Sequence, residues 1–273
     1  MHSKSTYSRL LDSGYVIGNL SCDTVKLVSS YGLDKYFKGK EKFLFGDIKD
    51  TGGIEYDYTR TYRTWGPSSK EEDTDLFTEV EKDIVQNCPV FSTGKKRRAF
   101  VSIEEYESTY TLIQSVAGVT RQCWHTDYDI SRVAQFLLSS TDRFVQVPLV
   151  ALVALEDDTY LPYIPGSHNV LCRGGLNFQE EKVLTLKKGQ YVLFHPLLIH
   201  RGAAYSKKNR RLHIYFDRPV CPRSTTKSGE ALTYPFDFLG KSHYAPSERL
   251  TILTKDVKGK LVRDAKANKR FKK

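Results

Sequence analysis

A histidine and an aspartate two positions apart are the residues of this sequence best suited to hold a metal ion. They are His125 and Asp127, within the tetrapeptide Trp-His-Thr-Asp. Residues two apart on a β-strand point to the same side, so an imidazole and a carboxylate can face one ion. A third ligand has to come from another segment, and His200 lies at the end of the apolar run LLIH. A His-x-Asp triplet is by itself a weak signal, because such triplets also arise by chance.

The chemistry of this donor set is more specific than its spacing. Two histidines and one carboxylate on one face of a metal leave three adjacent coordination positions open. That arrangement is typical of non-haem Fe(II) oxygenases, because the open positions can bind a co-substrate and O2 together. The pattern therefore favours His125, Asp127 and His200 as both the metal ligands and the catalytic residues of an iron oxygenase.

The sequence around these residues matches a known family in several short pieces that occur in the family's order. The pieces are WHTD at 124–127, VALEDD at 153–158, YIPGSH at 163–168, KKGQYVLFHPLLIHRGA at 187–203, NRRLHIYF at 209–216 and, near the start, GYVIGNLSCDTVKLV at 14–28. In these pieces the chain resembles the phytanoyl-CoA dioxygenase-like branch of the Fe(II)/2-oxoglutarate oxygenases. The resemblance implies a double-stranded β-helix core of the jelly-roll or cupin type, with Fe(II), 2-oxoglutarate and O2 as cofactor and co-substrates. It also implies hydroxylation of an unactivated C–H bond, with formation of succinate and CO2.

The resemblance further implies an arginine shortly beyond the distal histidine that binds 2-oxoglutarate, and both Arg210 and Arg211 are candidates. Strand alternation separates them, because Arg211, His213 and Tyr215 share a polar face while the residues between them are apolar. The polar face should line the cavity, which favours Arg211. A guanidinium suits this role because it can pair with a carboxylate through two hydrogen bonds. An aspartate at 127 favours hydroxylation, since family members that halogenate lack this carboxylate.

Several other polar residues are weaker candidates. Gln114, on the strand before the triad, is expected to contact the co-substrate or an iron-bound water. His213 is expected to hydrogen-bond within the pocket, because it shares the face of Arg211. His195 and His168 are interpreted as structural, since both lie in turn-like segments.

The apolar pattern predicts a mainly β protein with flanking helices. A strand followed by a helix is expected within 13–38, with Ser21 or Asp23 as the helix N-cap, and a scaffold helix is expected over 74–86. Further strands are expected near 108–117, 119–126, 145–155, 159–164, 182–186, 190–195, 198–204 and 211–217.

These elements predict one domain over residues 1–254. Its β-helix core spans about 108–217, with helical and loop support in 1–107 and a C-terminal extension in 218–254.

Composition limits the class of protein. Hydrophobic residues make up 40% and aromatic residues 12% of the 273 residues, which suits an enzyme with a real core. No apolar run approaches the roughly 18 residues of a membrane span. The five cysteines are dispersed and odd in number, and the first residues lack the apolar stretch of a secretory signal. The expected location is therefore cytoplasmic, with the nucleus as an alternative.

The C-terminal residues 255–273 form a basic tail, with nine Lys or Arg and two Asp, and so carry +7 of the chain's net +10. Such a tail either binds nucleic acid or another polyanion or is simply a solvated end. Three functions therefore remain. The favoured one is hydroxylation of a small molecule. The second is a 2-oxoglutarate oxygenase that modifies a nucleic acid or protein recruited by the tail, and the third is a non-catalytic metal-binding β-helix module. The sequence does not indicate an oligomeric state.

Overall fold

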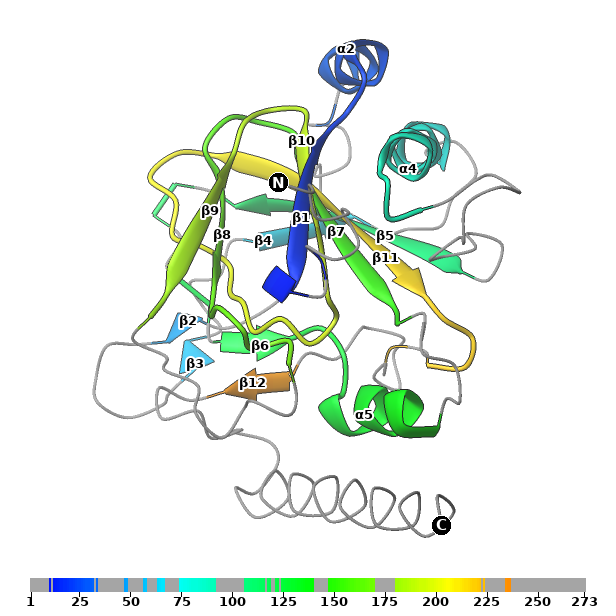
Figure 1. The fold of residues 1–273 in the computed structure, drawn as a ribbon. Helices are drawn as coiled ribbons and strands as arrows, with labels where there is room; N and C mark the ends of the chain where they lie inside the picture. Colours follow the sequence, from blue (N-terminus) through cyan, green and yellow to red (C-terminus); the bar gives the residue numbers. More distant parts are fainter. Residues whose placement is uncertain are drawn as a thin grey trace, which may run out of the picture.

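The computed structural model describes residues 10, 12–31, 33, 47–48, 56–57, 63–66, 74–91, 106–115, 117–118, 121–122, 124–139, 147–169, 180–221, 223 and 234–236. Antiparallel strands dominate these residues, and helices lie around them (Figure 1). The prediction of a mainly β protein with flanking helices is therefore confirmed. The basic tail and the cluster KKRR at 95–98 lie outside the described residues.

The larger sheet has six strands in the order β1-β10-β7-β11-β5-β4, and every neighbouring pair is antiparallel. Its central strand β7 has the sequence LVALVA and is buried along its whole length, as expected for a strand covered on both faces. The strand bounds are β1 (Tyr15–Asn19), β10 (Gln190–Phe194), β7 (Leu149–Ala154), β11 (Asn209–Asp217), β5 (Glu107–Ser115) and β4 (Arg63–Gly66).

A second, more irregular sheet faces the first. It contains two antiparallel pairs, β12 (Tyr234–Phe236) with β6 (Trp124–Thr126), and β8 (Thr159–Tyr163) with β9 (Lys182–Leu186). His200 joins the two pairs, because it forms one bridge to His125 and another to Tyr163. A separate short pair is formed by β2 (Asp47–Ile48) and β3 (Tyr56–Asp57).

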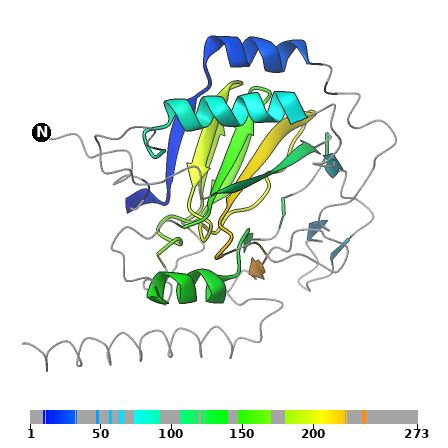
Figure 2. The ribbon, with the colours of Figure 1, turned by 90° about the vertical axis from the view of Figure 1, so that its right-hand side faces the viewer.

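Two apolar layers hold these parts together. Alternate residues of the large sheet face helices α2 (Cys22–Ser30) and α4 (Thr74–Asn87), which cover one side of that sheet (Figure 2). The intervening residues face the second sheet and form the inner layer. The outer layer includes Leu76, Val80, Ile84, Leu112, Ala151, Leu212, Ile214 and Phe216. The inner layer includes Trp124, Tyr128, Val150, Leu152, Leu161, Leu186, Val192, Phe194 and Tyr215.

The N-terminal elements agree with the expected pattern. The predicted helix over 74–86 is α4, and the predicted strand and helix within 13–38 are β1 and α2. Ser21 is the N-cap of α2, since its hydroxyl accepts a 3.3 Å hydrogen bond from the backbone N–H of Thr24. Both β1 and β4 belong to the large sheet, so residues before 108 contribute strands to it.

Three expectations need correction. Residues 130–139 form helix α5 (Ile130–Ser139), which was not expected between the strands. Of the expected strand over 119–126, the described residues are β-structure only from Trp124 to Thr126, and within 198–204 only His200 forms a bridge. Beyond the bridge, Gln122 contacts Gly202 through two hydrogen bonds. Its backbone N–H donates to the carbonyl of Gly202 at 3.0 Å, and its side chain accepts a 2.9 Å hydrogen bond from the N–H of Gly202.

Among the described residues, no helix combines the length and apolar character needed to cross a membrane.

Candidate metal centre

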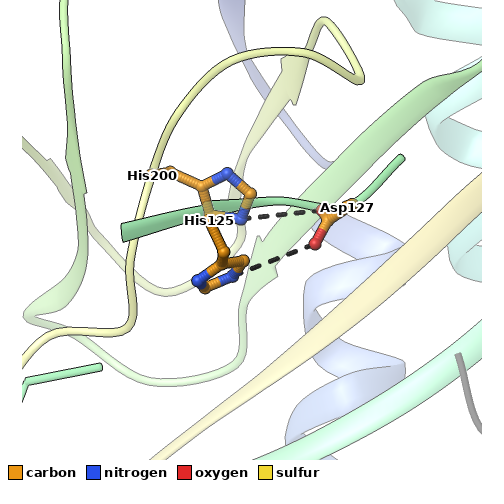
Figure 3. Close-up of side chains that lie close together, drawn as sticks. All are labelled: His125, Asp127 and His200. Carbon is orange, nitrogen blue, oxygen red and sulfur yellow. Dashed lines mark ion pairs between the residues drawn. The ribbon is translucent and has the colours of Figure 1, made fainter. Parts of the chain in front are cut away.

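The structure brings His125, Asp127 and His200 together at one buried point (Figure 3). His125 lies on β6, Asp127 directly follows that strand, and His200 comes from the segment that bridges to it. Nε2 of His125 is 4.0 Å from Oδ1 of Asp127, and Nε2 of His200 is 3.6 Å from Oδ2. The donor atoms of all three side chains lie within 4.8 Å of one another.

The two histidines are fixed by their backbones. The N–H of each donates to the carbonyl of the other, at 2.9 Å from His125 and at 3.0 Å from His200. Nδ1 of His200 lies 2.9 Å from the carbonyl oxygen of Leu198. Because a carbonyl only accepts hydrogen bonds, Nδ1 carries the proton and Nε2 presents a lone pair toward Asp127. This is the tautomer that a metal ligand needs.

The three residues fit a bound cation on electrostatic grounds. Asp127 is 4% exposed and His200 is 2% exposed. Within the described part of the chain, Oδ2 of Asp127 and Nε2 of His200 have no hydrogen-bond partner. Burial raises the pKa of Asp127, and the electrostatic effects of His200 and Arg223 lower it. A buried carboxylate without a donor is costly, and a divalent cation bound between these atoms would offset that cost. The donor set is consistent with Fe(II), 2-oxoglutarate and O2.

Arg211 lies on the inner face of β11, as strand alternation predicted. Arg211 is 4% exposed, and its guanidinium donates a 2.9 Å hydrogen bond to Oγ of Ser115 and lies 5.6 Å from the ring centre of Tyr205. Burial lowers the pKa of Arg211 from its ordinary value. Among the described residues no carboxylate pairs with this guanidinium. A buried cation without an acidic partner is therefore available to an anionic ligand.

Arg210 and Gln114 are placed differently. Arg210 points to the other face of the sheet, where its Nε lies 2.7 Å from Oε1 of Glu156. The register of β11 with β5 sets Gln114 opposite Arg210. Because directly opposed residues share a face, Gln114 is also on the side away from Arg211. The structure therefore does not bring these two residues to the metal centre, and the expectation of a co-substrate contact by Gln114 needs correction.

His213 is two residues from Arg211 on β11 and therefore shares its inner face. Its Nδ1 is 3.3 Å from the hydroxyl of Tyr215. Burial, followed by the electrostatic effects of Arg211, His200 and His125, holds the pKa of His213 well below its ordinary value of 6.5. A neutral imidazole is thus expected beside both the guanidinium and the histidine pair.

His195 and His168 lie apart from the metal donors. Their ring centres are 5.7 Å from one another, and the backbone N–H of His195 donates to the carbonyl of Gly14 at 2.8 Å. Among the described residues, the cluster able to hold a metal contains His125, Asp127 and His200 and neither of these two. Their position is that of turn residues, as interpreted from the sequence.

Two contacts that support the centre were not found from the sequence. The first joins Trp124 and Arg201: the guanidinium of Arg201 lies 4.1 Å from the ring centre of Trp124 and also bonds to Glu181. These two residues adjoin His125 and His200 in the chain. The second contact joins Tyr128 to Asp217 at 2.7 Å. Residues 89 apart give no local sequence signal of such a contact.

No protein-family model matches the sequence, and no curated protein sequence does. Solved structures do match. AviO1 from Streptomyces viridochromogenes Tue57 is 14% identical with a TM-score of 0.52, and the match covers 80% of this chain and 96% of that chain. EvdO2 from Micromonospora carbonacea var. aurantiaca is 15% identical with a TM-score of 0.51, over 85% of this chain and 98% of that chain.

A third solved structure, HygX from Streptomyces hygroscopicus, has nickel and 2-oxoglutarate bound. It is 13% identical with a TM-score of 0.50, over 83% of this chain and 90% of that chain. Identities this low support a statement about architecture and not about activity. The chain shares the fold of these proteins.

Proposed function

We propose that this protein is an Fe(II)- and 2-oxoglutarate-dependent dioxygenase that hydroxylates an unactivated C–H bond of a small molecule. Its two facing sheets are then the double-stranded β-helix of this enzyme class. The motifs within residues 124–217 resemble those of the phytanoyl-CoA dioxygenase-like branch and support a place for the chain in it. The nickel and 2-oxoglutarate bound to HygX support the choice of ligands.

One observation carries the proposal. The buried donor set of His125, Asp127 and His200 and the guanidinium of Arg211 lie along the same interior region. His213 connects them, since its pKa responds to Arg211 as well as to His200 and His125. 2-Oxoglutarate is a dianion that suits such a site. Its 2-oxo acid end can chelate the metal, and the carboxylate at its other end can pair with the guanidinium of Arg211.

The residues then have separate tasks. His125, Asp127 and His200 would hold Fe(II), which together with 2-oxoglutarate and O2 supplies the oxidant that converts C–H to C–OH with release of succinate and CO2. Arg211 would bind the distal carboxylate of 2-oxoglutarate and so set its orientation. The inner apolar layer excludes water and strengthens both electrostatic contacts.

Turnover without a primary substrate tests this proposal. Many reactions of this type proceed slowly when only the co-substrate is present, so purified protein with Fe(II), 2-oxoglutarate and air should form succinate. Asp127→Ala and Arg211→Ala should abolish or greatly reduce that product. Arg210→Ala is the matched control, because Arg210 pairs with Glu156 on the other face, and should retain it. Equal succinate from wild type and Asp127→Ala would contradict the proposal.

The same reaction can then identify substrates. Candidate small molecules should accelerate succinate formation and gain the mass of one oxygen atom. A protein that binds metal and 2-oxoglutarate but forms no succinate with any compound would instead support the non-catalytic metal-binding module.

A further inference from the structure

The carboxylate ligand itself has little to hold it in place. Within the described part of the chain, the side chain of Asp127 makes no hydrogen bond, and its two oxygens lie 4.0 Å and 3.6 Å from Nε2 of His125 and of His200. Its orientation must therefore come from the backbone that carries it. The residues on either side of Asp127 are correspondingly well fixed.

Thr126 and Tyr128 close a turn around Asp127. The hydroxyl of Thr126 donates a 3.0 Å hydrogen bond to the carbonyl oxygen of Tyr128, so the backbone on both sides of the carboxylate is tied together. Thr126 is 0% and Tyr128 is 1% exposed. The hydroxyl of Tyr128 then donates a 2.7 Å hydrogen bond to Oδ1 of Asp217, at the end of β11.

Asp217 is in turn held by other partly buried groups. Nε of Arg223 lies 3.3 Å from both oxygens of Asp217, and the hydroxyl of Thr109 donates to Oδ2 at 3.2 Å. The guanidinium of Arg223 also bonds to Thr109 and lies 3.5 Å from the ring centre of Tyr215. The turn around Asp127 is thus fastened to β11, the strand that carries Arg211.

We propose that Tyr128 is a positioning residue for the metal ligand Asp127, acting through its hydrogen bond to Asp217. Asp217 and Arg223 form the fixed end of this contact, and Thr126 transmits it to the backbone at Asp127. The inference rests on the proposed function, in that Asp127 has to be a metal ligand. Loss of partners that orient a ligand typically weakens metal binding by about 10-fold to 100-fold.

Metal binding without turnover tests the inference. Co(II), which replaces Fe(II) and has a visible spectrum, is titrated into the metal-free protein, and its affinity and absorption spectrum are recorded. Tyr128→Phe removes only the hydroxyl and should weaken Co(II) binding by about 10-fold or more. Tyr191→Phe is the control, since Tyr191 is a buried tyrosine of the outer apolar layer, and should bind Co(II) as wild type does.

A double-mutant cycle separates positioning from a general loss of structure. If Tyr128 acts through Asp127, Tyr128→Phe should weaken Co(II) binding no further once Asp127→Ala is present. Thr126→Ser retains the hydroxyl and should bind Co(II) better than Thr126→Val, which gives a second comparison should Tyr128→Phe fold poorly.

Two results would overturn the inference alone. The first is an affinity for Co(II) that is unchanged in Tyr128→Phe. The second is a loss of Co(II) affinity from Tyr128→Phe that is equal in the wild-type and Asp127→Ala backgrounds. Equal Co(II) binding by wild type and Asp127→Ala would overturn the ligand assignment itself and this inference with it.

Discussion

Replacing Arg211 by methionine should leave the free protein at least as stable as wild type, yet remove the stabilisation that 2-oxoglutarate provides. Arg211 is 4% exposed, and the described contacts of its guanidinium are one serine hydroxyl and one tyrosine ring. Burying a charge without an acidic partner is unfavourable, and replacement by an apolar side chain of similar length is often neutral or stabilising. The same charge should be favourable once a carboxylate of 2-oxoglutarate is bound.

The expected size of the effect follows from these contacts. Removing one member of a buried charge-assisted pair costs about 3 kcal/mol, which weakens 2-oxoglutarate binding about 100-fold. At a concentration of about 100 times the wild-type Kd, the co-substrate stabilises wild type by about 2.7 kcal/mol. At that concentration Arg211→Met should gain only about 0.4 kcal/mol.

Denaturant unfolding of the metal-loaded protein, with and without 2-oxoglutarate and without O2, measures both quantities. Arg210→Met is the matched control and should keep the full response to 2-oxoglutarate, because Arg210 is paired with Glu156. The reasoning would be refuted by an Arg211→Met variant that responds to 2-oxoglutarate as wild type does. It would also be refuted if Arg210→Met, and not Arg211→Met, lost the response.

Two further predictions concern pH and the basic tail. The pKa of His213 in the folded protein lies well below 6.5. Between that lowered pKa and pH 6.5, the unfolded state therefore binds more protons than the folded state. The free energy of unfolding should fall as the pH drops below about 6.5. The glutamine of His213→Gln does not titrate, so this variant should lose less stability per pH unit, by at most about 1.4 kcal/mol. Denaturant unfolding at several pH values measures this dependence. The same dependence on pH in wild type and His213→Gln would contradict a buried neutral His213. Removing residues 255–273, which carry +7, should weaken binding to a DNA or heparin column and reduce its salt dependence while 2-oxoglutarate turnover persists. Identical elution of the full and shortened chains would assign the tail no role in polyanion binding.

The sequence predicted the metal centre because its geometry is local. Spacing of two on a strand was enough to place His125 and Asp127 together, and the apolar run before His200 indicated an approach from a neighbouring segment. The same periodicity predicted that Arg211, and not Arg210, lies on the inner face of β11. The prediction followed from the apolar residues of β11, which alternate with Arg211 and belong to the outer layer.

The remaining features depend on information that is not local. In β5, polar residues occupy both faces, so the alternation of Thr109, Tyr110 and Thr111 does not reveal which face is inner. Pairing with β11 decides it, and this places Gln114 on the outer side. Helix α5 was not predicted from the sequence, and its apolar residues Ile130 and Val133 follow shortly after strand β6. The contact from Tyr128 to Asp217 depends on how the two sheets pack.

The most direct measurement of the central claim is spectroscopic and needs no substrate. Fe(II) and then 2-oxoglutarate are added to metal-free protein in the absence of O2, and the weak visible charge-transfer band of the chelated co-substrate is recorded. We expect a band in wild type and in Arg210→Ala, a loss of the band in Asp127→Ala, and a requirement for far more 2-oxoglutarate in Arg211→Ala. Folded wild-type protein that binds iron but shows no band at any 2-oxoglutarate concentration would contradict the central claim.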